Sequence, residues 1–87
     1  MFEVFLHNKA VSGMKKAGKE DQKRIKEDLK KLEKDPYSGK KLSGCQFYKI
    51  RTGDYRSIYE INNMDKKVIV LFIGHRKNVY DNFSKFI

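Results

Sequence analysis

Basic and aromatic residues are concentrated in one short stretch of the chain, FYKIRTGDYRSIY, residues 47–59. Side chains of a strand alternate between its two faces, so Lys49 and Arg51 are expected to share a face. Arg56 follows the turn of this hairpin and Arg76 follows a later apolar run, and a meander of strands can bring both beside them. Because guanidinium groups bind phosphate in a fork geometry, these four cations predict a site for a polyanion.

The same residues suit cleavage of RNA. Each cation disfavours the charged form of the next, so Lys49 is the expected proton acceptor. It would take the proton of a ribose 2′-hydroxyl attacking the adjacent phosphate, while the arginines stabilise the developing charge. Tyr80, close to Arg76 in the sequence, offers a ring for stacking an unpaired base. His7 and His75 are far apart and no spaced carboxylates accompany them, so we expect no metal and no cofactor.

A second interpretation of the hairpin is purely structural. Cations that alternate with apolar residues are also typical of a strand with one solvated face. Tyr55 and Tyr59 are then core residues rather than binding platforms, and His75 is a residue of a surface turn. On the residues alone, both interpretations stay open.

Composition favours a single domain, residues 1–87, with a polyanionic partner. The formal net charge is +9, of which residues 1–36 carry +3 and residues 37–87 carry +6. No apolar run is long enough to span a bilayer, and the first residues lack the basic and apolar regions of a signal peptide. The single cysteine, Cys45, cannot form an internal disulfide, so we expect a cytoplasmic protein and no role for this thiol.

Periodicity and turn residues predict the elements. Asn8 is expected to cap the first helix and Gly18 to end it, while Asp35-Pro36 ends the second helix. Thr52-Gly53-Asp54 is expected to form a three-residue hairpin turn, and Gly74 to end the last strand. The predicted strands are residues 2–6, 47–52, 55–61 and 67–73, and the predicted helices are residues 9–17, 20–34 and, at the C-terminus, 78–87.

This order predicts an α+β fold, β-α-α-β-β-β, with a short helix or tail at the end. The two helices form a hairpin that packs on a small antiparallel sheet, and the N-terminal strand lies at or near one edge. Ile50, Ile58 and Ile61 are expected to hold the sheet to the helices. The opposite face, with the cations, is then free to be used.

The whole chain resembles the RelE/ParE superfamily of toxins from prokaryotic type II toxin–antitoxin modules. The resemblance is carried by MFEVFLHNKA at the start, by DPYSGKKLSG before the hairpin, and most strongly by GDYRSIYEI and GHRKNVY. It implies the RelE-like microbial ribonuclease fold. In the RelE branch it implies a ribosome-dependent endoribonuclease that cuts mRNA in the A site of the 30S subunit and so inhibits translation.

The resemblance also implies which residues act. Two strand positions, an arginine after the turn, an arginine after the last strand and a tyrosine near the C-terminus make up the family's site. Here these catalytic positions are Lys49, Arg51, Arg56, Arg76 and Tyr80. The second strand position is lysine in the best-known member, and arginine cannot accept a proton at neutral pH. Proton abstraction therefore falls to Lys49, with His75 as the other candidate, and the expected substrate-binding residues are Lys41, His75 and Lys77.

Partners follow from the same resemblance. RelE toxins are neutralised by a small RelB-like antitoxin, and a heterotetramer is one stoichiometry of such complexes. The positive charge suits an acidic antitoxin segment that covers the basic face or displaces residues 78–87. No stretch resembles a helix that reads DNA, and no membrane partner is expected. One alternative function is that of ParE-like relatives, which share the fold, inhibit DNA gyrase and cut no RNA. Another is a basic module that binds RNA or the ribosome and has lost its catalytic activity.

Overall fold

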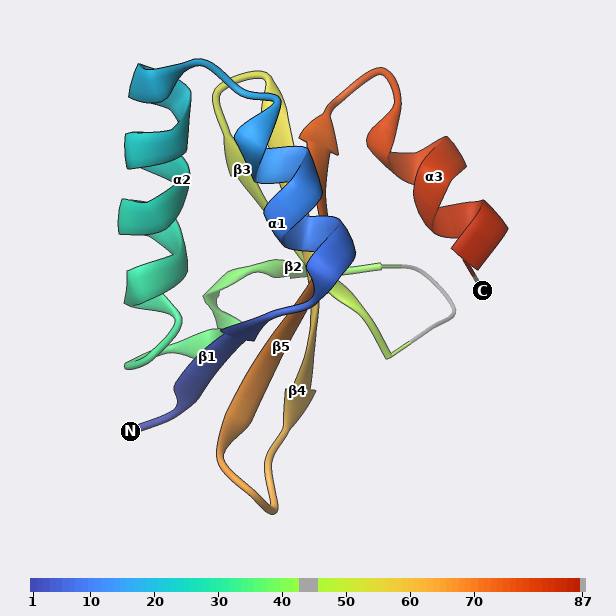
Figure 1. Ribbon diagram of the computed structural model, residues 1–87. Helices are drawn as coiled ribbons and strands as arrows, with labels where there is room; N and C mark the ends of the chain where they lie inside the picture. The colour runs from blue at the N-terminus through green and yellow to red at the C-terminus, as the bar shows by residue number, and fades with distance from the viewer. Residues whose placement is uncertain (43–45, 87) are drawn as a thin grey trace.

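The computed structural model describes residues 1–42 and 46–86 and shows one mixed sheet with helices on both sides (Figure 1). The strands lie in the order β1-β5-β4-β3-β2. Their bounds are β1 Glu3–Leu6, β2 Lys40–Lys41, β3 Tyr48–Thr52, β4 Tyr55–Asn62 and β5 Lys67–His75. The helices are α1 Asn8–Lys15, α2 Lys19–Lys31, a short 3-10 helix η1 Pro36–Ser38, and α3 Val79–Phe86. Cys45 lies outside the described residues.

The predicted α+β architecture and the position of the N-terminal strand are confirmed. β1 lies at one edge of the sheet, next to the apolar β5. It runs parallel to β5, whereas β2, β3, β4 and β5 pair antiparallel in sequence. The sheet is therefore mixed, because the helical hairpin returns the chain across the sheet before the antiparallel meander begins.

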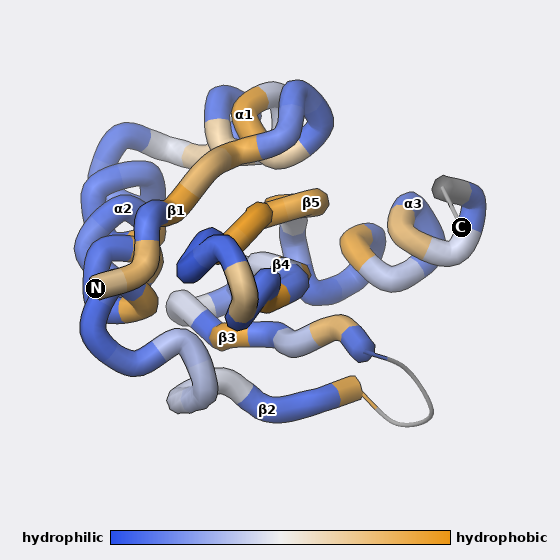
Figure 2. The backbone as a smooth tube through the Cα atoms, turned by 90° about the horizontal axis from the view of Figure 1, so that it is seen from below, coloured by the Kyte–Doolittle hydropathy of each residue, from blue (hydrophilic) through white to orange (hydrophobic). Residues whose placement is uncertain are grey.

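α1 and α2 bury one face of the sheet. Their spacing of apolar residues places Met14, Ile25 and Leu29 on the sides that face the sheet, where α1 contacts β5 and α2 contacts β3. Val70 of β5 and Tyr59 of β4 belong to the same core, and both are fully buried. Figure 2 shows the apolar part of β5 between α1 and β4. As predicted, Ile50 and Ile61 pack against this core, and so do Phe2, Val4 and Leu6.

α3 packs on the opposite face and makes a second, smaller core. Val79 and Phe83 of α3 are buried there against Phe72 and Ile58. The ring of Phe83 meets that of Phe72 edge to face at 5.7 Å. A bulge in β5 lets two successive residues, Leu71 and Phe72, contribute to this core, because the register shifts between Ile58 and Tyr59 of the partner strand.

The prediction that Ile58 faces the helical hairpin is wrong. Ile58 belongs to the core under α3, whereas Ile61 packs against the other core. The two residues are three positions apart in one strand, and side chains alternate with a period of two. Their separation by an odd number of residues puts them on opposite faces.

Several element boundaries also differ from the predicted ones. α1 begins at Asn8 and is capped by His7, whose Nδ1 accepts a hydrogen bond from the Lys9 backbone N–H at 3.1 Å. Gly18 does not end α1 but is the N-cap of α2. β5 continues through Gly74, which pairs with Arg56 in β4. Thr52 pairs with Tyr55, so the hairpin loop has two residues rather than three.

Candidate functional site

The tip of the β3–β4 hairpin gathers two of the predicted arginines. Gly53 has a φ of 58°, a conformation that glycine adopts without strain, and its carbonyl turns toward the strands. This oxygen accepts hydrogen bonds from Arg51 Nε at 3.3 Å and from Arg56 Nη1 at 3.0 Å. Arg51 and Arg56 are directly opposite one another in the ladder, so both side chains lie on the α3 side of the sheet.

Arg76 reaches the same tip from the end of β5. Its backbone N–H donates to the Asp54 carbonyl at 2.7 Å, and its Nε lies 3.8 Å from Asp54 Oδ1. Both side chains are more than half exposed, so the ion pair is weak and leaves the guanidinium accessible. The guanidinium groups of Arg51 in β3, Arg56 in β4 and Arg76 directly after β5 therefore contact two loop residues, Gly53 and Asp54.

Lys49 lies on the same face, one step back from the tip. It pairs with Ile58 in the ladder and is half-buried. Its Nζ lies 5.4 Å from the centre of the Tyr80 ring, a cation–π contact that joins β3 to α3. The Tyr80 hydroxyl is buried and has no hydrogen-bond partner within residues 1–42 and 46–86. We call the four basic residues Lys49, Arg51, Arg56 and Arg76 the cationic surface.

Three other predicted site residues are not brought into this group. His75 pairs with Tyr55, and the two rings meet edge to face at 5.8 Å on the side of the helical hairpin. The His75 Nδ1 accepts a hydrogen bond from the Lys77 backbone N–H at 3.2 Å, and Lys77 itself is exposed. Lys41 pairs with Tyr48, so the alternation of β2 directs it away from the cationic surface. Their roles in substrate binding stay predictions.

The sequence offered little signal for the residues that organise the site. Asp54 was expected only as a turn residue, although it contacts Arg76 through both its carbonyl and its carboxylate. Thr52 is buried and its hydroxyl donates to Asp28 of α2 at 2.7 Å, which fixes the hairpin to the helix. Lys40, on an edge strand too short to be predicted, pairs with Lys49.

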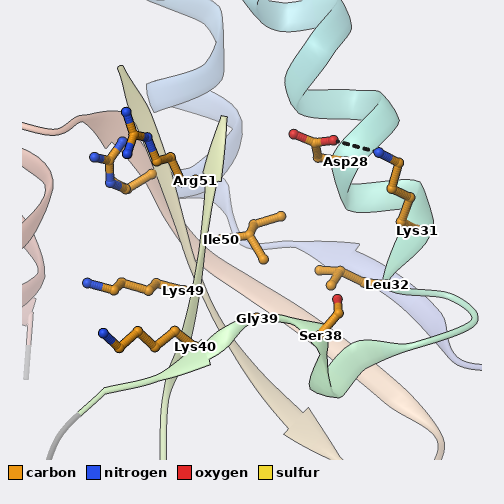
Figure 3. A pocket seen from close by; sticks show the side chains of 10 residues that line it. Asp28, Lys31, Leu32, Ser38, Gly39, Lys40, Lys49, Ile50 and Arg51 are labelled. Atoms are coloured by element: carbon orange, nitrogen blue, oxygen red, sulfur yellow. Dashed lines mark hydrogen bonds and ion pairs between the residues drawn. The ribbon is translucent and has the colours of Figure 1, made fainter. Parts of the chain in front are cut away.

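A hollow of about 530 Å³ runs along the edge of β3 beside this group. Figure 3 shows the residues that line it, with Lys49 and Lys40 pointing to one side of β3, and Ile50, Leu32 and Asp28 on the other. The hollow is thus bordered by the cations of β2, β3 and β4, which can bind phosphate oxygens, and by the apolar side chains of Ile50 and Leu32. Within the described part of the chain, no group of three His, Cys, Asp or Glu side chains could hold a metal ion.

The fold is similar to that of toxins whose structures have been solved in complex with antitoxins. The archaeal RelE–RelB complex from Pyrococcus horikoshii OT3 matches with a TM-score of 0.76 and 30% identity, covering 86% of this chain and 94% of that one. The RelB–RelE complex from Methanococcus jannaschii matches with a TM-score of 0.73 and 27% identity, covering 91% and 98%. The intact E. coli RelBE complex shares the fold at a TM-score of 0.76 and 24% identity, covering 86% and 96%. The class is that of small RelE-like toxins.

The sequence supports the same conclusion and gives the family. Residues 4–80 match the family of ParE toxins of type II toxin–antitoxin systems, parDE. The chain belongs to this family, and the resemblance noted from its motifs is confirmed. A search among curated proteins found no significant match. No helix in residues 1–42 or 46–86 has the length and apolar character needed to cross a membrane.

Proposed function

We propose that this toxin is a ribosome-dependent endoribonuclease that cuts mRNA in the A site and thereby stops translation in the cytoplasm. The observation that carries the proposal is the meeting of Arg51, Arg56 and Arg76 at one hairpin tip, with Lys49 on the same face. A gyrase inhibitor has no need of phosphate ligands arranged around a proton acceptor. A phosphoryl-transfer site needs both.

The reaction begins at the ribose 2′-hydroxyl. Lys49 accepts its proton, and the 2′-oxygen attacks the adjacent phosphorus. The bond from phosphorus to the 5′-oxygen of the next nucleotide breaks, which leaves a 2′,3′-cyclic phosphate and a free 5′-hydroxyl once that oxygen gains a proton. Arg56 and Arg76 bind the non-bridging oxygens as negative charge builds on them.

The surrounding residues hold this geometry. Gly53 O accepts from the guanidinium groups of both Arg51 and Arg56, and Arg56 Nη1 also donates to the Tyr55 carbonyl at 3.1 Å. Each guanidinium carries five N–H donors, so both arginines can still donate to phosphate. The Tyr80 ring limits the positions open to the Lys49 ammonium through the contact at 5.4 Å. Regulation comes from a small RelB-like antitoxin, as in the RelE–RelB complexes of similar fold. Its acidic segments would cover the cationic surface and exclude RNA.

Inhibition of DNA gyrase is the second candidate, and one observation favours it. The family that residues 4–80 match is named for ParE. A gyrase inhibitor would keep the fold while leaving the cationic surface unused.

Expression of the wild-type chain beside Lys49→Ala and Arg76→Ala variants, with mapping of mRNA ends, separates the two candidates. Growth arrest with new cuts in translated mRNA is expected for the wild type, and each substitution should lower the cleavage rate about 100- to 1,000-fold. Arg24→Ala is the matched control, because Arg24 is an exposed cation of α2 outside the cationic surface. Arrest with intact mRNA in all four chains would exclude the nuclease and favour gyrase.

A further inference from the structure

We propose that Lys40 is an additional RNA-binding residue, which holds the phosphate next to the scissile one. The inference rests on the proposed nuclease function and deepens it, because it gives the site a second phosphate position. Neither composition nor motif pointed to Lys40, which lies in the link between η1 and β3. The structure places it through the two-residue strand β2.

The register of β2 brings Lys40 to the cationic surface. Lys40 is directly opposite Lys49 in the antiparallel ladder, and residues in such a pair have side chains on the same face. Figure 3 shows the two ammonium groups extending side by side, away from Ile50. Lys41 pairs with Tyr48 and faces the other way. One residue of the Lys-Lys pair is thus selected by geometry alone.

The link that carries Lys40 is held firmly against the sheet. The Tyr59 hydroxyl donates to the Pro36 carbonyl at 2.7 Å, and the Tyr59 ring is fully buried. Gly39 lies so close that a Cβ there would overlap the Tyr59 hydroxyl and come within 2.7 Å of the Lys49 carbonyl. This close approach requires a residue without a Cβ, so the backbone directly before Lys40 packs against Tyr59 and β3.

The repulsion between the paired Lys40 and Lys49 would be relieved by an anion bound between them. Like charges directly opposite one another destabilise a sheet. Neither Lys40 nor Lys49 has a carboxylate partner among the described residues. A phosphate group near both would compensate the repulsion, and its place is open, because both lysines line the hollow along β3.

The arrangement separates two tasks along β3. The arginines at the hairpin tip and Lys49 surround the reacting phosphate, whereas Lys40 lies one strand further out. Because Lys40 would contact a phosphate that does not react, it should bind the RNA equally well in the ground state and in the transition state. Its removal should therefore weaken binding and leave the rate at saturation nearly unchanged.

The test uses ribosomes programmed with a short mRNA and an empty A site, mixed with the full chain. For Lys40→Ala, we expect the half-saturating toxin concentration to rise about tenfold, the effect of one lost charge-assisted hydrogen bond. The log–log slope of affinity against salt should become shallower by about 0.7, the value for one phosphate contact on a single strand. Lys40→Arg should restore both. Lys34→Ala, which removes an exposed charge elsewhere, is the matched control.

Each outcome decides the inference. A Lys40→Ala effect no larger than that of Lys34→Ala, or smaller than that of Lys41→Ala, would overturn it. The nuclease function is judged separately, by whether the wild type cuts at all. Binding of all variants to ribosomes carrying a 2′-deoxy A-site codon, which cannot be cut, reports the phosphate contact even if cleavage fails. In that case a selective loss for Lys40→Ala would keep the contact and reject the reaction.

Discussion

The two faces of the sheet are built for different purposes. The face under α1 and α2 is mainly apolar, and Ile25 and Leu29 of α2 belong to the same buried core as Val68 and Val70. The face under α3 is apolar only near Ile58 and Phe72, and beside that patch the cationic surface begins. α3 covers the apolar part and leaves the arginines at the hairpin tip accessible.

This difference shows how a chain of 87 residues can keep a charged site without losing its fold. Lys49, Arg51 and Ile50 alternate in β3, so one strand serves both faces at once. The apolar residues on the helical side stabilise the fold, and the cations on the other side are free to bind phosphate. Stability and activity should therefore respond to different substitutions.

The largest expected separation is between Ile25 and Arg56. Ile25→Ala should lower the free energy of unfolding by about 3 kcal/mol, because Ile25 is fully buried and a cavity would remain. Arg56→Ala should change it by less than about 1 kcal/mol, since its hydrogen bonds go to backbone carbonyls near the surface. Urea unfolding gives both values, and mRNA cleavage should show the reverse order.

A large loss of stability in Arg56→Ala would contradict this separation. It would mean that the guanidinium braces the hairpin rather than serving the substrate. Arg56→Lys also tests whether Arg56 serves the substrate rather than the fold, because it keeps the positive charge but loses the fork geometry of the guanidinium. It should preserve stability and still lower the rate of cleavage.

Period-two alternation was enough to predict the main part of the cationic surface. Lys49 and Arg51 share a face as expected, and Arg56 joins them because the short turn keeps it opposite Arg51. The same rule, misapplied over three residues, assigned Ile58 to the wrong core. The local pattern is reliable within a strand because the pleat itself determines it.

What could not be predicted depends on contacts between distant segments. β2 has only two residues and therefore no alternating pattern, so the pairing of Lys40 with Lys49 could not be predicted from the sequence. The bulge at Leu71, which brings two successive residues into the core under α3, leaves no local signature in the sequence. The role of Asp54 follows from where β5 ends relative to the hairpin, which only the assembled sheet determines.

Phe83 tests whether the two cores are independent. Phe83→Ala should cost about 2 kcal/mol, less than a loss in the main core, because α3 can detach without unfolding the sheet. Cleavage should fall about tenfold although Phe83 is not expected to touch RNA, since Tyr80 on the same helix would no longer hold Lys49. Asn82→Ala, at an exposed position of α3, is the matched control. Unchanged cleavage in Phe83→Ala would show that α3 stabilises the fold without supporting the site.

The smallest expected effect concerns Tyr59, and it changes with pH. Burial raises the pKa of Tyr59 from 10.0 to about 12, against the opposing effect of a hydrogen bond from the Gly39 backbone. Because the raised pKa favours the neutral form in the folded state, its contribution to stability is complete below pH 10.0 and is lost as the pH rises toward about 12.

The Tyr59→Phe variant should be about 1 kcal/mol less stable at neutral pH, because it loses the hydrogen bond to Pro36, but its stability should lack this dependence on pH. Unfolding in urea at pH 8 to about 11 should therefore show the wild-type and variant curves converging, by about 1 kcal/mol for each pH unit above 10. The two chains differ only at this residue, so the difference between the curves isolates Tyr59. Parallel curves would mean that the hydroxyl ionises as freely as in the unfolded chain, and that the link before Lys40 is not anchored to this face of the sheet.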